Sequence, residues 1–216
     1  MFSKRVGDPF NMYGNSGETQ TFLNKLEAIR LLYKSVESFQ VEEKVRLRAD
    51  LDRVCESSRD YELAGVELHF IDHYLRMQRM SILLLSYSVL ESSLVAICDN
   101  FAKELNLPLS VADLNGSGIE RCKKYLESFD LFCITSNPEL KNCWDKLSFL
   151  NKLRNCFAHA EGDISKFPKI KTASIEGKKK EGLSLRGSHI IIESDYVMDT
   201  IEAIKLFLSL LNQKII

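Results

Sequence analysis

Residues that break regular structure are scarce in this chain, which has only 4 prolines and 10 glycines among 216 residues. Long linkers and low-complexity segments are therefore not expected. The sequence also lacks a Cys-x-x-Cys pair, and the long, irregular spacings of its six cysteines argue against a zinc site. No glycine-rich phosphate loop, Gly-x-Ser-x-Gly elbow or kinase signature occurs. The formal net charge is −1, so nucleic acid would have to bind at a local basic patch.

An apolar signal core is missing as well, because the N-terminus contains Lys4 and Arg5 and leads into polar residues. We therefore expect no secretory route, a cytoplasmic location and reduced thiols. One apolar stretch, residues 80–98, is about long enough to cross a bilayer. It carries Glu91 near its middle, where an ionised carboxylate is costly in lipid. We interpret it as a core helix of a soluble protein, with no membrane partner.

The remaining composition, 45% hydrophobic and 27% charged, is ordinary for a globular protein. Apolar residues recur at helical spacing along most of the chain, which predicts an all-α fold: a helical bundle with a small β-hairpin before the C-terminal helix. We expect helices over residues 18–40, 41–58, 62–105, 119–132 and 138–160, and from 195 onward. Short strands are expected at residues 174–176, 184–186 and 189–192, around glycines.

This pattern predicts three parts along the chain. Residues 1–17 form an irregular N-terminal segment, residues 18–60 a helical extension, and residues 61–216 the main helical domain.

The helix over residues 138–160 has clear signals at both ends. Ser136 or Asn137 can cap it, and Pro138 suits the first turn. Its apolar positions recur every three or four residues and predict a buried face, and Gly162 is a plausible stop.

Near the end of this helix stand Arg154, Asn155 and His159. An arginine stays charged and can hold a phosphate with several donors at once. A histidine can give or take a proton near neutrality. Together these chemistries are what RNA cleavage without a metal requires.

Helix geometry limits how one copy of the motif can act. Asn155 and His159 are four residues apart and share a face, whereas Arg154 and His159 differ in direction by about 140°. Two such helices packed about a two-fold axis would line one cleft with two arginines and two histidines. The structural alternative is that Arg154 pairs with a nearby acid and His159 ends the helix, where a cation is favoured.

The order of elements around Arg154-Asn155-x-x-x-His159, with a ribbon and then a last amphipathic helix, resembles the HEPN family of all-helical domains. Ribonucleases of that family carry an Arg-x4–6-His motif with a polar residue after the arginine. The resemblance covers about residues 62–213. It implies a dimer with the motifs at the subunit interface, metal-free RNA cleavage and a role as a toxin or antiviral effector. Other members have lost catalysis and act as binding or scaffolding modules.

Glu91 is a second candidate, because a carboxylate inside an apolar helix is costly unless it is paired. One interpretation is structural, a pair with an arginine or a helix cap. The other places the acid near Arg154 and His159, where it would orient either group.

A basic stretch follows the motif. Between residues 164 and 190, seven lysines and arginines face two glutamates, a local charge of +5. We expect Lys178, Lys179, Lys180 and Arg186 to bind the RNA backbone. The alternative is a solvated, lysine-rich edge that protects the ribbon from aggregation.

His69 and His73 are four residues apart on one helix, but no third metal ligand stands at matching spacing. We therefore expect neither a metal nor another cofactor.

These observations predict a metal-independent endoribonuclease. The RNA 2′-hydroxyl attacks the adjacent phosphate and leaves a 2′,3′-cyclic phosphate and a 5′-hydroxyl. His159 acts as general base or acid, Arg154 stabilises the charge on the phosphate oxygens, and Asn155 orients the phosphate or the histidine. The expected partners are RNA, a second copy of the chain, and an antitoxin or defence-system protein.

A different class of function is also open, a non-catalytic helical module that binds RNA or protein in a defence or regulatory system. A third alternative is a nucleotide-binding helper of a nucleotidyltransferase, although no dedicated base or ribose pocket is evident.

Overall fold

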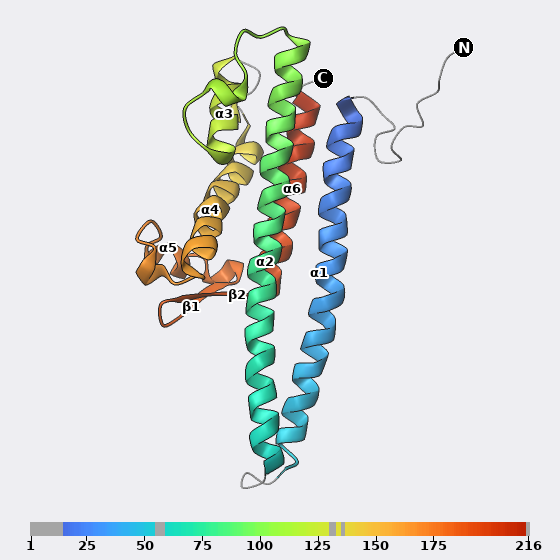
Figure 1. The fold of residues 1–216 in the computed structure, drawn as a ribbon, viewed down its shortest axis with the longest axis vertical. Coiled ribbons are helices and arrows are strands. Elements are labelled where there is room, and N and C mark those ends of the chain that lie inside the picture. Colours follow the sequence, from blue (N-terminus) through green and yellow to red (C-terminus); the bar gives the residue numbers. More distant parts are fainter. Residues whose placement is uncertain (1–14, 55–58, 130–132, 135–136, 215–216) are drawn as a thin grey trace, which may run out of the picture. The chain divides into compact units, whose positions relative to one another are not determined.

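The computed structural model describes residues 15–54, 59–129, 133–134 and 137–214. These residues form helices and one two-stranded hairpin (Figure 1). The helices are α1 (Asn15–Leu51), α2 (Arg59–Glu104), α3 (Gly118–Ser128), α4 (Pro138–Ala160), α5 (Thr172–Glu176) and α6 (Ser194–Lys214), and the strands are β1 (Leu183–Arg186) and β2 (His189–Ile192). The predicted all-α fold, with a small hairpin before the last helix, is confirmed.

The N-terminal helix differs in its bounds from the prediction. The ranges 18–40 and 41–58 were expected as two helices, but α1 runs without a break to Leu51. It begins at Asn15, so residues 15–17 are helical and not irregular. Residues 1–14 and 55–58 lie outside the described part of the chain.

The expected strand at residues 174–176 is wrong, because these residues belong to α5. Local bonds supply their backbone partners: the Ser174 amide donates to the Lys171 carbonyl at 2.9 Å, and the Gly177 amide donates to the Ala173 carbonyl at 3.0 Å. A backbone satisfied in this way needs no strand partner. Ile175 is buried, which anchors the short helix.

The hairpin itself follows the prediction. Strands β1 and β2 pair in antiparallel register from Leu183 opposite Ile192 to Arg186 opposite His189. Two residues connect the strands, and the first of them, Gly187, has a φ of 62°. Such tight turns require a positive φ, which glycine adopts without strain.

The described chain comprises two compact units. The first consists of the described residues of Met1–Ala28, Leu85–Arg154 and Asp199–Ile216. The core of this unit includes Trp144 of α4 and Phe207 of α6, whose ring centroids are 5.7 Å apart. An ion pair of 3.1 Å between Lys205 and Glu27 joins α6 to α1 at the surface of the unit.

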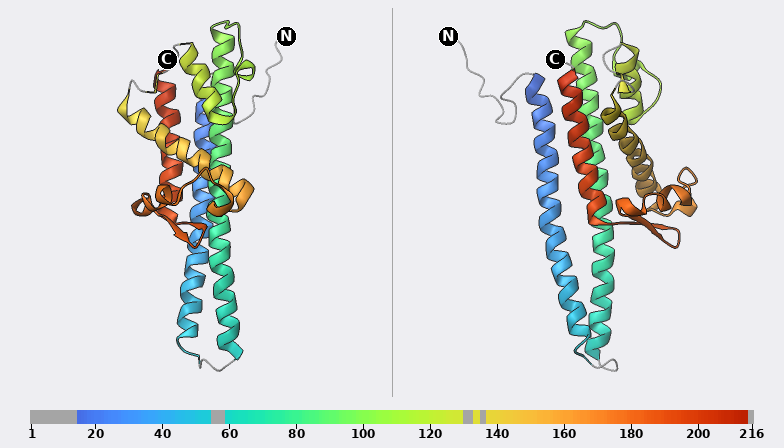
Figure 2. Two further views of the ribbon diagram at one scale, coloured as in Figure 1. Left: turned by 90° about the vertical axis from the view of Figure 1, so that its left-hand side faces the viewer. Right: turned by 180° about the vertical axis from the view of Figure 1, so that it is seen from behind.

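The second unit consists of the described residues of Ile29–Leu84 and Asn155–Met198. Within it α1 and α2 run side by side, as both views of Figure 2 show. Hydrogen bonds link these helices to the hairpin: Arg79 of α2 donates to the Ile192 carbonyl at 2.6 Å. The hydroxyl of Tyr33 donates to that of Ser194 at 2.9 Å, which ties α1 to the start of α6.

Both units contain residues of the predicted extension (18–60) and of the predicted main domain (61–216), and that boundary stays a prediction. Helix α2 is, among the described residues, long and apolar enough to cross a membrane. A core helix of a soluble protein has the same composition, so the cytoplasmic location stays a prediction too.

Candidate functional site

Helix α4 positions the predicted motif, and its ends follow from its sequence. The Asn137 side chain accepts hydrogen bonds from the amides of Glu139 at 2.8 Å and Leu140 at 3.4 Å, so Asn137 is the cap. Ser136, the other capping candidate, lies outside the described residues. The apolar positions predicted to face the core are buried, namely Leu140, Trp144, Leu147, Leu150, Leu153 and Phe157.

The helix ends at Ala160, where the chain turns into a left-handed conformation over Glu161, with a φ of 51°, and Gly162, with a φ of 77°. A Cβ atom on this residue would lie 3.0 Å from Nη2 of Arg76 and 3.4 Å from the Phe157 ring. Backbone conformation and close packing therefore both require glycine here. The predicted stop is confirmed, and it fixes the last turn of α4 on which His159 lies.

The three motif residues differ in their environment. Arg154 and Asn155 are half-buried, and His159 is exposed. Among the described residues His159 has no hydrogen-bond or ion-pair partner, so its imidazole is open to solvent and to a ligand. Between them Cys156 and Phe157 are buried and hold the turn against the core.

Arg154 is positioned by an aromatic ring. Its guanidinium carbon lies 5.6 Å from the ring centroid of Tyr87 on α2, a cation–π contact. The Tyr87 hydroxyl donates a hydrogen bond of 3.0 Å to Oδ1 of Asn151 on α4. Burial, together with the nearby negative charge of Glu91, raises the pKa of Tyr87 to about 12. The phenol therefore remains neutral and serves as a fixed platform for the arginine.

Glu91 is half-buried. Its Oε1 atom lies 3.3 Å from the position of a Cβ on Gly118, and the Tyr87 hydroxyl lies 3.0 Å from the same position. Gly118 is the first residue of α3, so the carboxylate lies at a helix N-terminus, where a negative charge is stabilised. Of the predicted site residues, Glu91 and Arg154 both lie beside Tyr87.

Tyr87 and Asn151 were not predicted as site residues. Their sequence signals are spacings on helices: Tyr87 stands four residues before Glu91, and Asn151 stands three before Arg154 and four before Asn155. Tyr87 is the one tyrosine of the apolar stretch 80–98, but a single tyrosine among apolar residues is typical of a buried core position, so its spacing did not indicate a site residue.

The basic residues lie on short elements of the second unit. Lys179 and Lys180 are exposed on a 3₁₀ turn (Lys179–Glu181) that packs against β1, and Arg186 is exposed at the end of β1. Lys178 forms an ion pair of 2.9 Å with Glu181. Three of the four predicted RNA contacts are therefore open to a ligand, and the fourth is held by a carboxylate.

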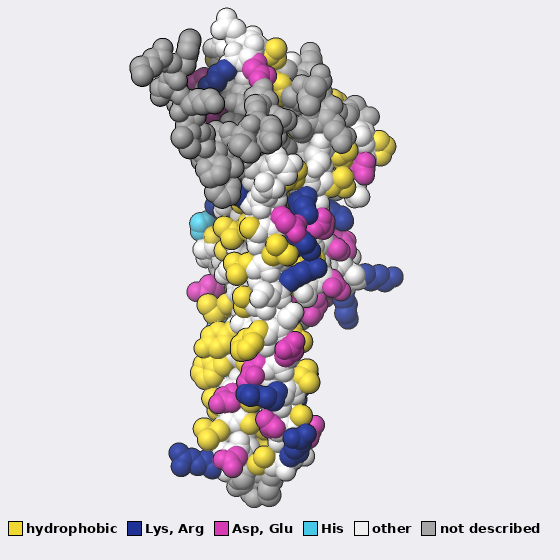
Figure 3. All heavy atoms as spheres, turned by 90° about the vertical axis from the view of Figure 1, so that its right-hand side faces the viewer, with side chains coloured by type: hydrophobic (Ala, Val, Ile, Leu, Met, Phe, Trp, Pro, Cys, Tyr) yellow, Lys and Arg dark blue, Asp and Glu magenta, His cyan; other side chains and the backbone are white. Residues whose placement is uncertain are grey.

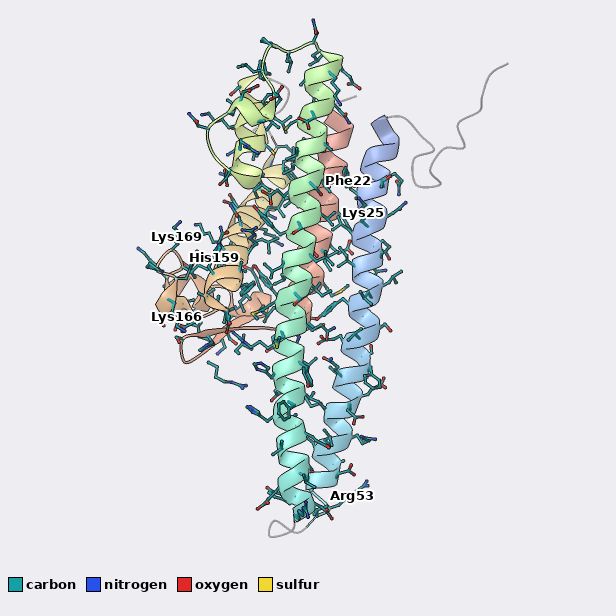
Figure 4. The ribbon with its side chains drawn as sticks, viewed as in Figure 1. Phe22, Lys25, Arg53, His159, Lys166 and Lys169 are labelled. Carbon is teal, nitrogen blue, oxygen red and sulfur yellow. The ribbon has the colours of Figure 1, made fainter. Side chains whose placement is uncertain are left out.

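Further lysines follow His159 along the chain. Figure 4 shows His159 at the end of α4, with Lys166 and Lys169 on the segment that comes after it. Both lysines are exposed, although Lys166 lies 3.7 Å from Asp163. The turn that follows the motif thus carries positive charge on the side open to solvent.

Cysteine chemistry does not contribute to this site. Cys156 is buried, and burial raises the pKa of its thiol to about 11, so it remains protonated. The cysteines that the structure describes form no disulfide; Cys55 lies outside this part. His69 and His73 are exposed on α2, and no group of three metal-binding side chains occurs among the residues described.

Three comparisons with known proteins, with family models, with curated proteins and with solved structures, each found no match. The all-α class is thus defined by the structure, and the activity must be argued from the chemistry of the site.

Proposed function

We propose that the protein is a metal-independent endoribonuclease whose catalytic groups are Arg154 and His159. One observation carries the proposal: at the end of α4 the imidazole of His159 is exposed and without a partner among the described residues, while Arg154 is held on an aromatic platform. A guanidinium with a fixed orientation suits a phosphate, and an accessible imidazole suits proton transfer.

The proposed reaction is transesterification. The RNA 2′-oxygen forms a bond to the adjacent phosphorus while the bond from phosphorus to the 5′-oxygen breaks. The 2′-hydroxyl loses its proton, and the departing 5′-oxygen gains one, with His159 as base or acid in these transfers. Arg154 stabilises the charge on the phosphate oxygens, and Asn155 orients the phosphate or the histidine. The products are a 2′,3′-cyclic phosphate and a 5′-hydroxyl.

The proposal includes a homodimer, because helix geometry separates Arg154 from His159 within one copy. Exposed apolar residues on α2 support it: Leu63, Val66, Phe70 and Met77 are separated by three, four and seven residues, the spacing of a coiled-coil seam. Figure 3 shows hydrophobic side chains gathered over this part of α1 and α2. A second copy would cover such a surface.

The cleavage test uses a labelled RNA, purified protein and a chelator. We expect cleavage with chelator present, and products that end in a cyclic phosphate. His159→Ala and Arg154→Ala should each abolish cleavage and leave the circular dichroism spectrum unchanged. The matched control is His189→Ala, an exposed histidine of the same unit. Activity that vanishes with chelator and returns with a divalent ion would contradict the mechanism.

The dimer has its own test, the mass in solution by sedimentation. We expect twice the chain mass for the wild type, and the single-chain mass with little cleavage for Phe70→Glu. Leu109→Glu changes an equally exposed residue in a loop of the other unit and should leave the mass unchanged. A wild-type protein of single-chain mass that still cleaves would contradict the paired motif.

The stacking of Arg154 on Tyr87 also favours a second candidate, a non-catalytic module in which the arginine is structural. That module would bind RNA and give equal RNA patterns in the lanes of wild type and His159→Ala. A toxin or antiviral role, with an antitoxin or defence-system partner, is proposed from the HEPN resemblance alone.

A further inference from the structure

A cavity of about 250 Å³ lies within the second unit, between α1, α2 and the hairpin. Basic side chains dominate its lining: Lys44, His69, His73, Arg76, Arg79 and Arg186. Two carboxylates, Asp72 and Glu193, also line it. The four permanent cations outnumber these acids, so the cavity is suited to an anion.

The carboxylates neutralise only some of the cations. Lys44 forms an ion pair with Asp72, and Arg79 is paired with Glu37 and lies 3.5 Å from Glu193. Arg186, exposed at the end of β1, and Arg76 form no ion pair with any described residue. Two uncompensated arginines therefore face this small volume.

Two of the arginines are held in place by backbone carbonyls. Arg76 donates from Nη2 to the Glu161 carbonyl at 2.5 Å and from Nε to the Ile190 carbonyl at 3.3 Å. Its Nη1 group has no partner in the described part of the chain. Arg79 donates from Nη1 to the Ile192 carbonyl at 2.6 Å. Donors that are already oriented lose little side-chain entropy when a ligand binds.

We propose that this cavity binds a phosphate monoester through Arg76, Arg186 and the two histidines. A terminal phosphate carries close to two negative charges and three acceptor oxygens, which matches several converging donors better than a carboxylate does. His69 and His73 are four residues apart on α2 and supply further donors at the rim. His69 and His73, which lack the third ligand that a metal site would need, would thus contact the phosphate.

The size of the cavity limits the ligand. A volume of about 250 Å³ is below that of pockets for drug-sized molecules. It accommodates a phosphate and part of the group that the phosphate esterifies, but no folded chain. The two sources with this chemistry are a free mononucleotide and the 5′-phosphate end of an RNA.

Calorimetric titration at constant ionic strength tests the proposal, with inorganic phosphate, adenosine 5′-monophosphate and acetate as probes. We expect saturable binding of the two phosphates and none of acetate. Arg186→Gln and His73→Gln change exposed side chains, and each should weaken binding about tenfold, as expected for one lost charge-assisted hydrogen bond. The matched control is Arg53→Gln, an exposed arginine of the same unit (labelled in Figure 4) that should bind as the wild type does.

A short RNA with a 5′-phosphate, compared with the same RNA bearing a 5′-hydroxyl, distinguishes the sources. Preference for the phosphorylated end assigns the cavity to RNA ends, and equal binding assigns it to a free nucleotide. Absence of phosphate binding, or equal weakening in Arg53→Gln, would overturn the proposal.

The proposal does not depend on RNA cleavage. His159→Ala should bind phosphate normally, and His73→Gln, which changes a cavity residue outside the predicted RNA contacts, should still cleave RNA as the wild type does. A protein that binds phosphate but does not cleave RNA would contradict only the endoribonuclease proposal. A protein that cleaves RNA but does not bind phosphate would contradict only the cavity proposal.

Discussion

Arg79 of α2 and Glu37 of α1 form a buried ion pair in which Nη2 lies 2.5 Å from Oε1. Their side chains are only 13% and 9% exposed, so neither charge is well solvated. Arg79 also donates to the Ile192 carbonyl at the end of β2. One guanidinium thus joins two long helices and the hairpin within the second unit.

Replacing Glu37 by leucine should lower the free energy of unfolding by about 3 kcal/mol, because it leaves a buried guanidinium without its main counter-charge. The double variant Glu37→Leu/Arg79→Met removes both charges and should recover most of this loss. Urea denaturation at neutral pH measures both. The control is Glu43→Gln, which removes the exposed pair with Arg46 and should cost less than about 1 kcal/mol. If Glu43→Gln lowered the free energy of unfolding as much as Glu37→Leu, burial of the ion pair would not explain the loss.

Phe207 is fully buried in the core of the first unit, in ring contact with Trp144. Truncation by Phe207→Ala should lower the free energy of unfolding by about 3–5 kcal/mol, since it removes buried apolar area and leaves a cavity. Phe39→Ala makes the same chemical change at a side chain that is 68% exposed, and it should cost less than about 0.5 kcal/mol. Urea denaturation of the two variants measures the difference in their free energies of unfolding. Similar losses of free energy in both would contradict the burial of Phe207.

Asp163 controls the turn after the motif. Hydrogen bonds from Ser165 and Ser188 lower the pKa of its carboxyl to about 2. An unfolded aspartate titrates near pH 3.9, so the stabilisation is complete above about pH 4 and is lost as the pH falls toward 2. We expect wild type to exceed Asp163→Asn in stability at neutral pH, and the difference to shrink over this range. Denaturation from pH 6 to 2 measures it; a difference that does not change with pH would exclude the carboxylate as its source.

The sequence predicted the elements whose signals are local. The Asn137 cap, the Gly162 stop and the apolar repeat of α4 lie within one continuous stretch, so the helix and its buried face were predicted correctly. The three residues 174–176 are too few to distinguish a strand from a helical turn, and that strand was wrong.

Long-range relationships were not predictable from local pattern. Glu37 lies 42 residues before Arg79, and Tyr87 lies 64 residues before Asn151. Contacts between helices depend on tertiary packing, and the spacing of residues within one helix does not predict them. The platform beneath Arg154 and the cavity beside the hairpin therefore became apparent only in three dimensions.

If the Tyr87 ring orients Arg154 for the proposed cleavage, removal of the ring should lower the rate. Tyr87→Leu removes the ring on which the guanidinium lies, so we expect about a tenfold lower rate, equivalent to about 1.4 kcal/mol of transition-state stabilisation. Tyr87→Phe keeps the ring and loses only the hydrogen bond to Asn151, and it should retain most of the rate. Single-turnover cleavage of a labelled RNA by excess protein measures this, with circular dichroism to confirm folding. If the leucine variant cleaves as fast as wild type, the ring does not orient the arginine; if both variants are equally slow, the hydroxyl and not the ring is the essential group.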